Sequence, residues 1–201
     1  MSILDQFIRK IRTTLKNNVT DKVEHSVNNA INNSKRTIKF NNLPKSVDDL
    51  KALPGGDLSD PFATAALTIA ALCEFPKDRE ACIAMLNYLK GPRPLSPMES
   101  KFIADRFMDG VDYIPRSYLA GSTVENDYTP SVPYSIDVWE LAHSKDNYSQ
   151  GYLRLFVNSA GADSPRYIDL RLKPSTQQWF LWEYGGILSG IRVPQSKNEW
   201  A

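Results

Sequence analysis

DPFATAALTIAALCEF, residues 60–75, is the most apolar stretch of this 201-residue chain. Asp60 is a good helix cap, Pro61 suits the first helical turn, and a proline directly after the stretch ends the pattern. Only Thr64 and Thr68 interrupt an apolar surface that runs almost completely round the predicted helix. A folded protein can bury such a helix only by surrounding it with other elements. We therefore expect residues 60–75 to form a central helix.

Three more helices are expected around the central one. A short helix opens near Ser46, and a longer one covers 78–90, close enough in sequence to form an antiparallel hairpin with 60–75. The last begins at Ser96 and runs to about residue 108. Its apolar side, which should face the hairpin, comprises Phe102, Ile103, Arg106 and Phe107.

After residue 110 the apolar pattern changes from a helical period to strict alternation, which is typical of strands. Four strands are expected, at 134–141, 152–157, 167–172 and 179–184. Turn-rich segments join them, so antiparallel pairing is favoured over βαβ units. The sequence therefore predicts an α+β fold: a helical hairpin plus a third helix, packed with a small antiparallel β-sheet.

Three segments make up the predicted domain organisation. Residues 1–36 form an amphipathic N-terminal helix, and 37–45 a linker that contains a short extended piece. Residues 46–201 form a single α+β domain. Its helical half is 46–110 and its antiparallel β half is 111–201.

The N-terminal helix carries its strongest apolar stripe in the first half, at Leu4, Phe7, Ile8, Ile11 and Leu15. Three uses of this stripe remain open: packing on its own domain or on a second copy, docking to another protein, and lying on a membrane surface through residues 2–16. The membrane hypothesis rests on the basic residues that flank the stripe and would meet lipid headgroups.

Composition limits the function classes. The formal net charge is +1, which argues against general nucleic-acid binding, although residues 1–39 carry eight basic side chains against three acidic ones. Two cysteines do not make a disulfide framework. Charged residues near the N-terminus break any signal-peptide core, and no apolar run is long enough to span a bilayer. These features predict a cytoplasmic protein.

No motif for catalysis or metal binding emerges from the sequence. Cys73 and Cys82 lie on apolar faces of predicted helices, where cysteine usually behaves as a small hydrophobe. With His25 and His143 they show no zinc-ligand spacing. Pro54–Asp57 lacks the ending of a phosphate-binding loop. We therefore predict no catalytic residue, no metal and no cofactor.

Arginines and aromatic residues of the C-terminal half are the remaining candidates for ligand or partner binding. The candidate residues are Tyr113, Arg116, Tyr118, Arg154, Asp163, Arg166 and Arg171. On the predicted strands, Tyr152, Phe156, Tyr167 and Asp169 share a face with Arg154 and Arg171. Such a face suits carboxylates, peptides or sugars, and equally it fits cross-strand ion pairs and stacked rings. Trp179, Trp182 and Tyr184 are predicted to be core residues.

Several segments resemble an uncharacterised family of bacterial domains. They are LKALPGGDLSDPFA from residue 50, LNYLKGPRPLSP from residue 86, GADSPR from residue 161, WFLWEY from residue 179 and GIRVP from residue 190. The similarity covers about residues 45–201. It implies one unit over that span and, because the family has no assigned activity, no catalytic residue.

The function that these features favour is a non-enzymatic protein-interaction module. Its partner would be another protein or a second copy of the chain, reached through the N-terminal helix. The alternative is an enzyme of unrecognised type, with a cleft between the two halves lined by Arg93, Arg116 and Arg166.

Overall fold

The computed structural model describes residues 34–200 of the chain. In that range the protein is α+β, with four α-helices, a five-stranded antiparallel sheet and five short 3₁₀ turns. The helices are α2 (Val47–Ala52), α3 (Pro61–Leu72), α4 (Arg79–Lys90) and α5 (Pro97–Arg106). The strands are β1 (Lys35–Phe40), β2 (Tyr134–Trp139), β3 (Tyr152–Val157), β4 (Arg166–Lys173) and β5 (Gln178–Glu183). The 3₁₀ turns are η1 (Met108–Gly110), η2 (Pro115–Tyr118), η3 (Tyr148–Gln150), η4 (Gly185–Leu188) and η5 (Gln195–Lys197).

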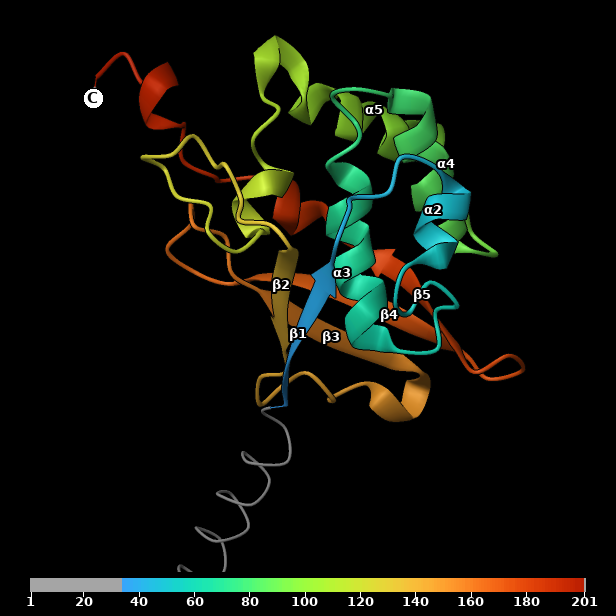
Figure 1. The fold of residues 1–201 in the computed structure, drawn as a ribbon. Helices are drawn as coiled ribbons and strands as arrows, with labels where there is room; N and C mark the ends of the chain where they lie inside the picture. The colour runs from blue at the N-terminus through green and yellow to red at the C-terminus, as the bar shows by residue number, and fades with distance from the viewer. Residues whose placement is uncertain (1–33, 201) are drawn as a thin grey trace, which may run out of the picture.

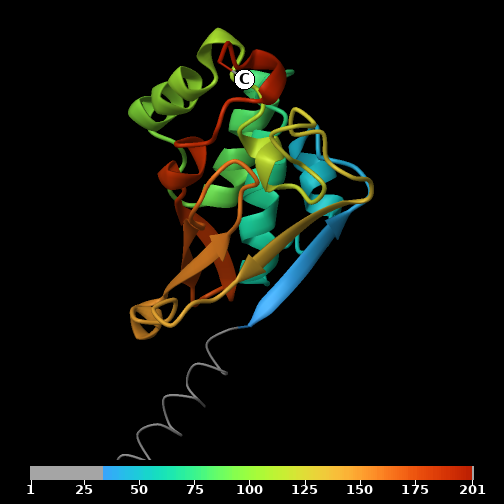
Figure 2. The ribbon, with the colours of Figure 1, turned by 90° about the vertical axis from the view of Figure 1, so that its left-hand side faces the viewer.

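Helix α3 is the central element, as its sequence predicts. Every residue from Phe62 to Leu72 is buried, and the helix contacts all five strands. The sheet, in the order β1-β2-β3-β4-β5, curls around it (Figure 1). Figure 2 shows α3 between β1 on one side and β4 and β5 on the other. The Asp60 carboxylate caps α3 by accepting a hydrogen bond of 3.0 Å from the Phe62 N–H.

The segment just before α3 ties both edges of the curled sheet together. Arg36 in β1 donates to the Asp60 carboxylate over 3.0 Å. From β5, the Trp179 N–H donates to the Leu58 carbonyl at 2.8 Å. The Gln178 side chain donates to the backbone carbonyl of Asp57. The two edge strands are therefore held at the same end of one helix, although they come from opposite ends of the described chain.

The other predicted helices are also present. Asp78 caps α4, which packs against α3 through a buried face that comprises Cys82, Met85, Leu86 and Leu89. Ser96 and Glu99 form the capping box of α5. That helix buries Ile103, and Phe107 at its end stacks on Phe75 with ring centroids 4.4 Å apart.

The four strands predicted after residue 110 are present, with ends shifted by at most two residues. The fifth strand, β1, contains the short extended piece expected within the 37–45 linker, and it corrects two points: the strand begins at residue 35, which was expected in the N-terminal helix, and it is part of the sheet. Lys35–Phe40 instead pairs with β2 along its whole length, from Lys35 opposite Trp139 to Phe40 opposite Tyr134. Only Phe40 of this strand is fully buried, so its own sequence carries a weak strand signal.

The rest of the predicted N-terminal helix, including Leu4, Phe7, Ile8, Ile11 and Leu15, lies outside the described residues. None of the helices in the described part of the chain is long and apolar enough to cross a membrane.

Candidate functional site

Two of the predicted binding residues belong to the interior. Tyr113 is buried and stacks on Tyr128, with ring centroids 5.6 Å apart. Tyr118 is also buried, and its hydroxyl donates to the Ile187 carbonyl over 2.8 Å. Burial raises the pKa of both phenols. Tyr118 thereby ties the chain after α5 to the C-terminal segment, and Tyr113 packs in the interior against Tyr128.

Three more candidates form structural contacts instead of a shared site. Arg116 pairs with Asp112, four residues earlier, at 3.0 Å. Asp163 pairs with Arg192. Arg166 donates to backbone carbonyls, among them that of Gly190 at 3.1 Å. The arginines expected to line an enzyme cleft are thus held by different partners, since Arg93 lies against Trp182, Arg116 at Asp112, and Arg166 beside the C-terminal segment.

The outer face of the sheet, which points away from α3, does gather arginines and aromatic rings. Arg154 of β3 forms two hydrogen bonds of 2.7 Å to the Asp169 carboxylate of β4. Its guanidinium also lies 3.9 Å from the centroid of the Tyr167 ring. The hydrogen bonds that Arg154 donates to the Asp169 carboxylate are the main reason that the pKa of Arg154 is raised. Arg154 and Asp169 therefore form a cross-strand ion pair, one of the two arrangements that the sequence allowed for this face.

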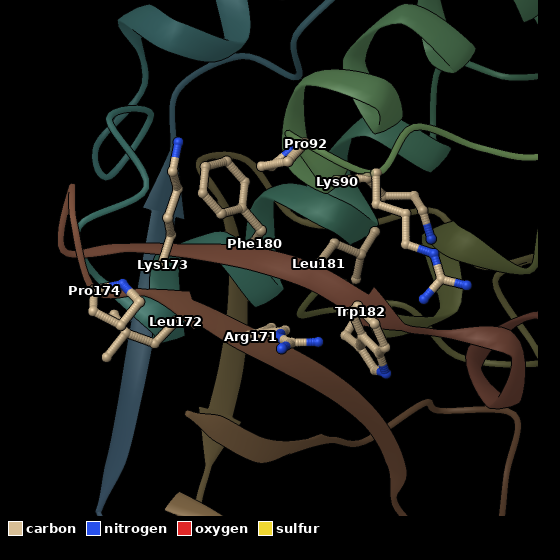
Figure 3. Close-up of a pocket in the computed structure, with 10 residues that line it drawn as sticks. Lys90, Pro92, Arg171, Leu172, Lys173, Pro174, Phe180, Leu181 and Trp182 are labelled. Atoms are coloured by element: carbon tan, nitrogen blue, oxygen red, sulfur yellow. The ribbon is translucent and has the colours of Figure 1, made fainter. Parts of the chain in front are cut away.

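Next to this pair, a groove of about 520 Å³ runs over β4 and β5. One wall is the end of α4 and the loop after it, and the other is the two strands. We call it the basic groove, and its lining residues are Lys90, Pro92, Arg93, Arg171, Leu172, Lys173, Pro174, Phe180, Leu181 and Trp182. Four of the ten are cationic and none is acidic. Figure 3 shows Arg171 and Trp182 side by side on neighbouring strands.

A glycine brings the loop after α4 onto the sheet. Gly91 ends α4 with φ 58° and ψ −116°, a conformation that residues with a Cβ avoid. A Cβ at this position would also clash with the Phe180 ring. This turn and close approach place Pro92 and Arg93 beside β5.

Two contacts hold the loop in place. The Asn87 side chain accepts a hydrogen bond of 2.8 Å from the Leu95 N–H. Lys90 donates to Glu99 of α5 over 2.6 Å, and the Lys90 side chain is only 4% exposed. Burial of Glu99 alone raises its pKa, but hydrogen bonds from Lys90 and Ser96 outweigh this effect and bring the pKa to about 2. The pair is therefore charged at neutral pH, and the Lys90 charge is already neutralised.

Trp182 lies at an irregularity in β5. Leu170 of β4 lies opposite Leu181, and Asp169 lies opposite Glu183, so Trp182 has no opposite residue. An extra residue of this kind is a β-bulge, which bends the strand and redirects side chains. The sequence predicted a core position for Trp182, and this is a correction: the residue is only partly buried and lines the basic groove. Trp179 and Tyr184 are buried, as predicted.

Two guanidinium groups lie against the Trp182 ring. Arg93 reaches it from the α4–α5 loop at 4.7 Å from the centroid, and Arg171 reaches it from β4 at 4.9 Å. Arg171 also lies 4.9 Å from the Tyr152 ring. Neither arginine, nor Lys173, forms an ion pair with any residue between 34 and 200. The groove thus holds three cations without a carboxylate partner in the described chain.

Of the groove residues, only Arg171 was among the predicted partner-binding residues, and Arg93 was predicted for a different cleft. Sequence alternation could have identified Trp182 as an outer-face residue, because it is two residues from Phe180 and out of phase with Trp179 and Leu181. Nothing in the sequence indicates that the α4–α5 loop meets β5.

The two cysteine thiols of the described region are not activated. Cys73 and Cys82 are both buried and both free. Burial raises the pKa of the Cys73 thiol to about 12 and also raises that of Cys82. Neither thiol is therefore ionised at neutral pH. Within residues 34–200 no three His, Cys, Asp or Glu side chains come close enough together to hold a metal ion.

The fold defines a class of small α+β domain in which a curled antiparallel sheet encloses a buried helix. Residues 42–195 match the family described as Domain of unknown function (DUF6935), and the chain belongs to that family. This match confirms the resemblance seen in the sequence. No curated protein and no solved structure matches the chain at a significant level. The family description names no activity, so function has to be argued from the groove.

Proposed function

We propose that this protein is a non-enzymatic interaction module that binds an acidic segment of a protein partner in the basic groove. The observation that carries the proposal is the Trp182 ring flanked by Arg93 and Arg171, two guanidinium groups without carboxylate partners in the described chain. Arginine at such positions is suited to carboxylates, which it can bind through two parallel hydrogen bonds.

The shape and polarity of the groove favour a peptide over a compact small molecule. The groove is open along two strands, and Pro92, Phe180 and Trp182 are among the apolar residues that line it. Aromatic and arginine side chains of this kind dominate the binding energy at protein interfaces. An extended peptide can lay one side chain on Trp182 and place carboxylates at Arg93, Arg171 and Lys173.

Charge favours a protein partner over nucleic acid. The whole chain carries a formal net charge of only +1, and the groove holds only three cations without a carboxylate partner in the described chain. Binding to a nucleic-acid backbone draws on many phosphate contacts along an extended basic surface. A short acidic peptide needs only the three cations present here.

Self-association or docking through Leu4, Phe7, Ile8, Ile11 and Leu15 remains a second prediction from the sequence, as does the membrane-surface alternative through residues 2–16. Both concern residues outside the described range. They are compatible with a groove that binds a separate partner.

The experiment that tests the proposal measures fluorescence anisotropy of labelled peptides with the full chain at low salt. A Glu-rich decapeptide is compared with its Gln-substituted analogue and with a single-stranded oligo-dT of the same length. The double variant R93Q/R171Q should weaken binding of the acidic peptide about tenfold or more, since each charged hydrogen bond contributes about 1.5–3 kcal/mol.

The matched control is K77Q/K101Q, which removes the same charge from exposed positions away from the groove. It should leave the affinity within about twofold of wild type. Equal losses in the two double variants would show that binding depends on net charge and would contradict the groove as the site. Binding of oligo-dT without binding of the acidic peptide would overturn the choice of partner.

A further inference from the structure

A second hollow, of about 430 Å³, lies on the same outer face of the sheet and shares one wall with the basic groove. The shared wall is Trp182, which lines both. We call this second space the mixed-charge hollow, and its charged lining residues are Asp146, Arg154, Asp169 and Glu183, with His143 beside Asp146.

The charge of the mixed-charge hollow is opposite to that of the basic groove. Arg154 and Asp169 neutralise each other through two hydrogen bonds of 2.7 Å. The carboxylates of Asp146 and Glu183 remain, and Glu183 forms no ion pair with any residue in the described range. One side of Trp182 therefore carries three uncompensated cations, and the other side carries an excess of carboxylate.

The β-bulge in β5 places Glu183 on the same face of the sheet as Trp182. In a regular strand Trp182 and Glu183 would point to opposite faces of the sheet. Here both line the mixed-charge hollow, because the register shift next to Trp182 puts the two consecutive side chains on one face.

The spacing of the two charged regions matches an extended peptide. Asp169 and Arg171 lie two residues apart on the outer face of β4, which is about 7 Å along the strand. Side chains i and i+2 of an extended ligand are separated by the same distance and also share a face. An acidic side chain at one position and a basic one at the other would therefore lie on the two sides of Trp182.

We infer that the preferred partner segment is dipolar: an extended peptide that places a carboxylate in the basic groove and an ammonium or guanidinium group, two residues away, beside Glu183. This inference rests on the proposed function, because the first half of the ligand is the acidic side chain already assigned to the groove. It adds a determinant of specificity, Glu183, that neither the sequence nor the family assigns.

The test compares three peptides that differ only at their third position: Glu-Ser-Lys, Glu-Ser-Gln and Glu-Ser-Glu, each within the same neutral flanks. The reversed order, Lys-Ser-Glu, is included because an extended peptide can bind in either chain direction. With the full-length wild-type protein, the tighter of the two dipolar peptides should bind about three- to fivefold more tightly than Glu-Ser-Gln, the gain expected of a solvent-exposed ion pair. Glu-Ser-Glu should bind no more tightly than Glu-Ser-Gln.

Variant E183Q should remove the advantage of the dipolar peptide while leaving the affinity for Glu-Ser-Gln unchanged. The matched control E125Q, which removes an exposed carboxylate elsewhere, should keep the advantage. Variant R171Q should weaken the binding of every one of these peptides.

The outcomes separate the two proposals. Equal binding of dipolar and acid-only peptides, both weakened by R171Q, would overturn the dipolar inference and leave the acidic-peptide function standing. Tighter binding of Glu-Ser-Glu would also overturn it. A dipolar advantage that persists in E183Q would contradict the role of Glu183. No binding of any acidic peptide would overturn both proposals.

Discussion

The ammonium group of Lys90 lies 2.6 Å from a carboxylate oxygen of Glu99, and the two side chains differ sharply in exposure, at 4% and 38%. This ion pair joins the last residue of α4 to the first turn of α5 and so closes the loop that carries Arg93. Because only Lys90 is fully buried, removing the charge of Glu99 should have a different effect on stability from removing the charge of Lys90.

Glu99→Gln should destabilise the protein by about 2 kcal/mol, because it leaves the buried Lys90 ammonium without a countercharge while glutamine keeps the capping hydrogen bond. Lys90→Met should cost less than about 1 kcal/mol, since methionine fills a similar volume and the remaining carboxylate can be hydrated. Urea unfolding of both variants measures the difference. A larger loss for Lys90→Met than for Glu99→Gln would contradict this account.

The same pair predicts a loss of stability in acid. The pKa of Glu99 is about 2 in the folded protein, against an ordinary value of 4.5. A group whose pKa is lower in the folded state contributes stability that is complete above its ordinary pKa and is lost as the pH falls toward the folded value. The stability difference between wild type and Glu99→Gln should therefore be constant above about pH 5.5 and shrink from pH 4.5 to 2. Urea titrations across this range measure it, and a difference independent of pH would rule out the mechanism.

Gly91→Ala should cost about 2 kcal/mol or more, because it combines an unfavourable backbone conformation with a clash against the Phe180 ring. It should also weaken peptide binding, since Phe180 and the loop that follows Gly91 line the basic groove. Gly186→Ala is the control, because a Cβ there meets nothing within 4 Å. Thermal unfolding and peptide anisotropy test both parts, and similar behaviour of the two variants would count against a special role for Gly91.

Both enlargement and truncation of the α3 interior should destabilise the fold. Leu67→Ala should cost about 3 kcal/mol by leaving a cavity, and Ala66→Leu about 2 kcal/mol by overpacking the core around α3. Met98→Ala, at a side chain that is 82% exposed, should change stability by less than about 0.5 kcal/mol. Chemical denaturation gives all three values. A neutral Ala66→Leu would mean that the core around α3 is not tightly packed.

Local signals in the sequence were sufficient for most of the fold. Asp60, Asp78 and Ser96 each act as the predicted helix caps, and each predicted strand after residue 110 is present. Caps and alternation are visible because they depend on residues only a few positions apart. For Lys35–Phe40 the sequence predicted only a short extended piece in a linker, because its place in the sheet depends on pairing with a segment about 100 residues later in the chain.

The candidate site was predicted only in part, for the same reason. The sequence placed Arg154 and Arg171 on one face of the sheet, and the structure distinguishes them: Arg154 is paired with Asp169, while Arg171 lies against Trp182. Which arginine keeps its charge available depends on cross-strand register, which no short segment of the sequence specifies.

By itself, the sequence determined that a helix apolar on nearly all sides had to be surrounded by other elements, and that these would be further helices and an antiparallel sheet. Only the tertiary structure decided that Gly91 would turn the chain onto Phe180, that a bulge would leave Trp182 unopposed, and that Arg93 would reach it from a distant loop. Burial of apolar surface constrains each segment separately and is therefore visible along the chain. A binding groove depends on contacts between segments, whose geometry exists only once the sheet has closed around the helix.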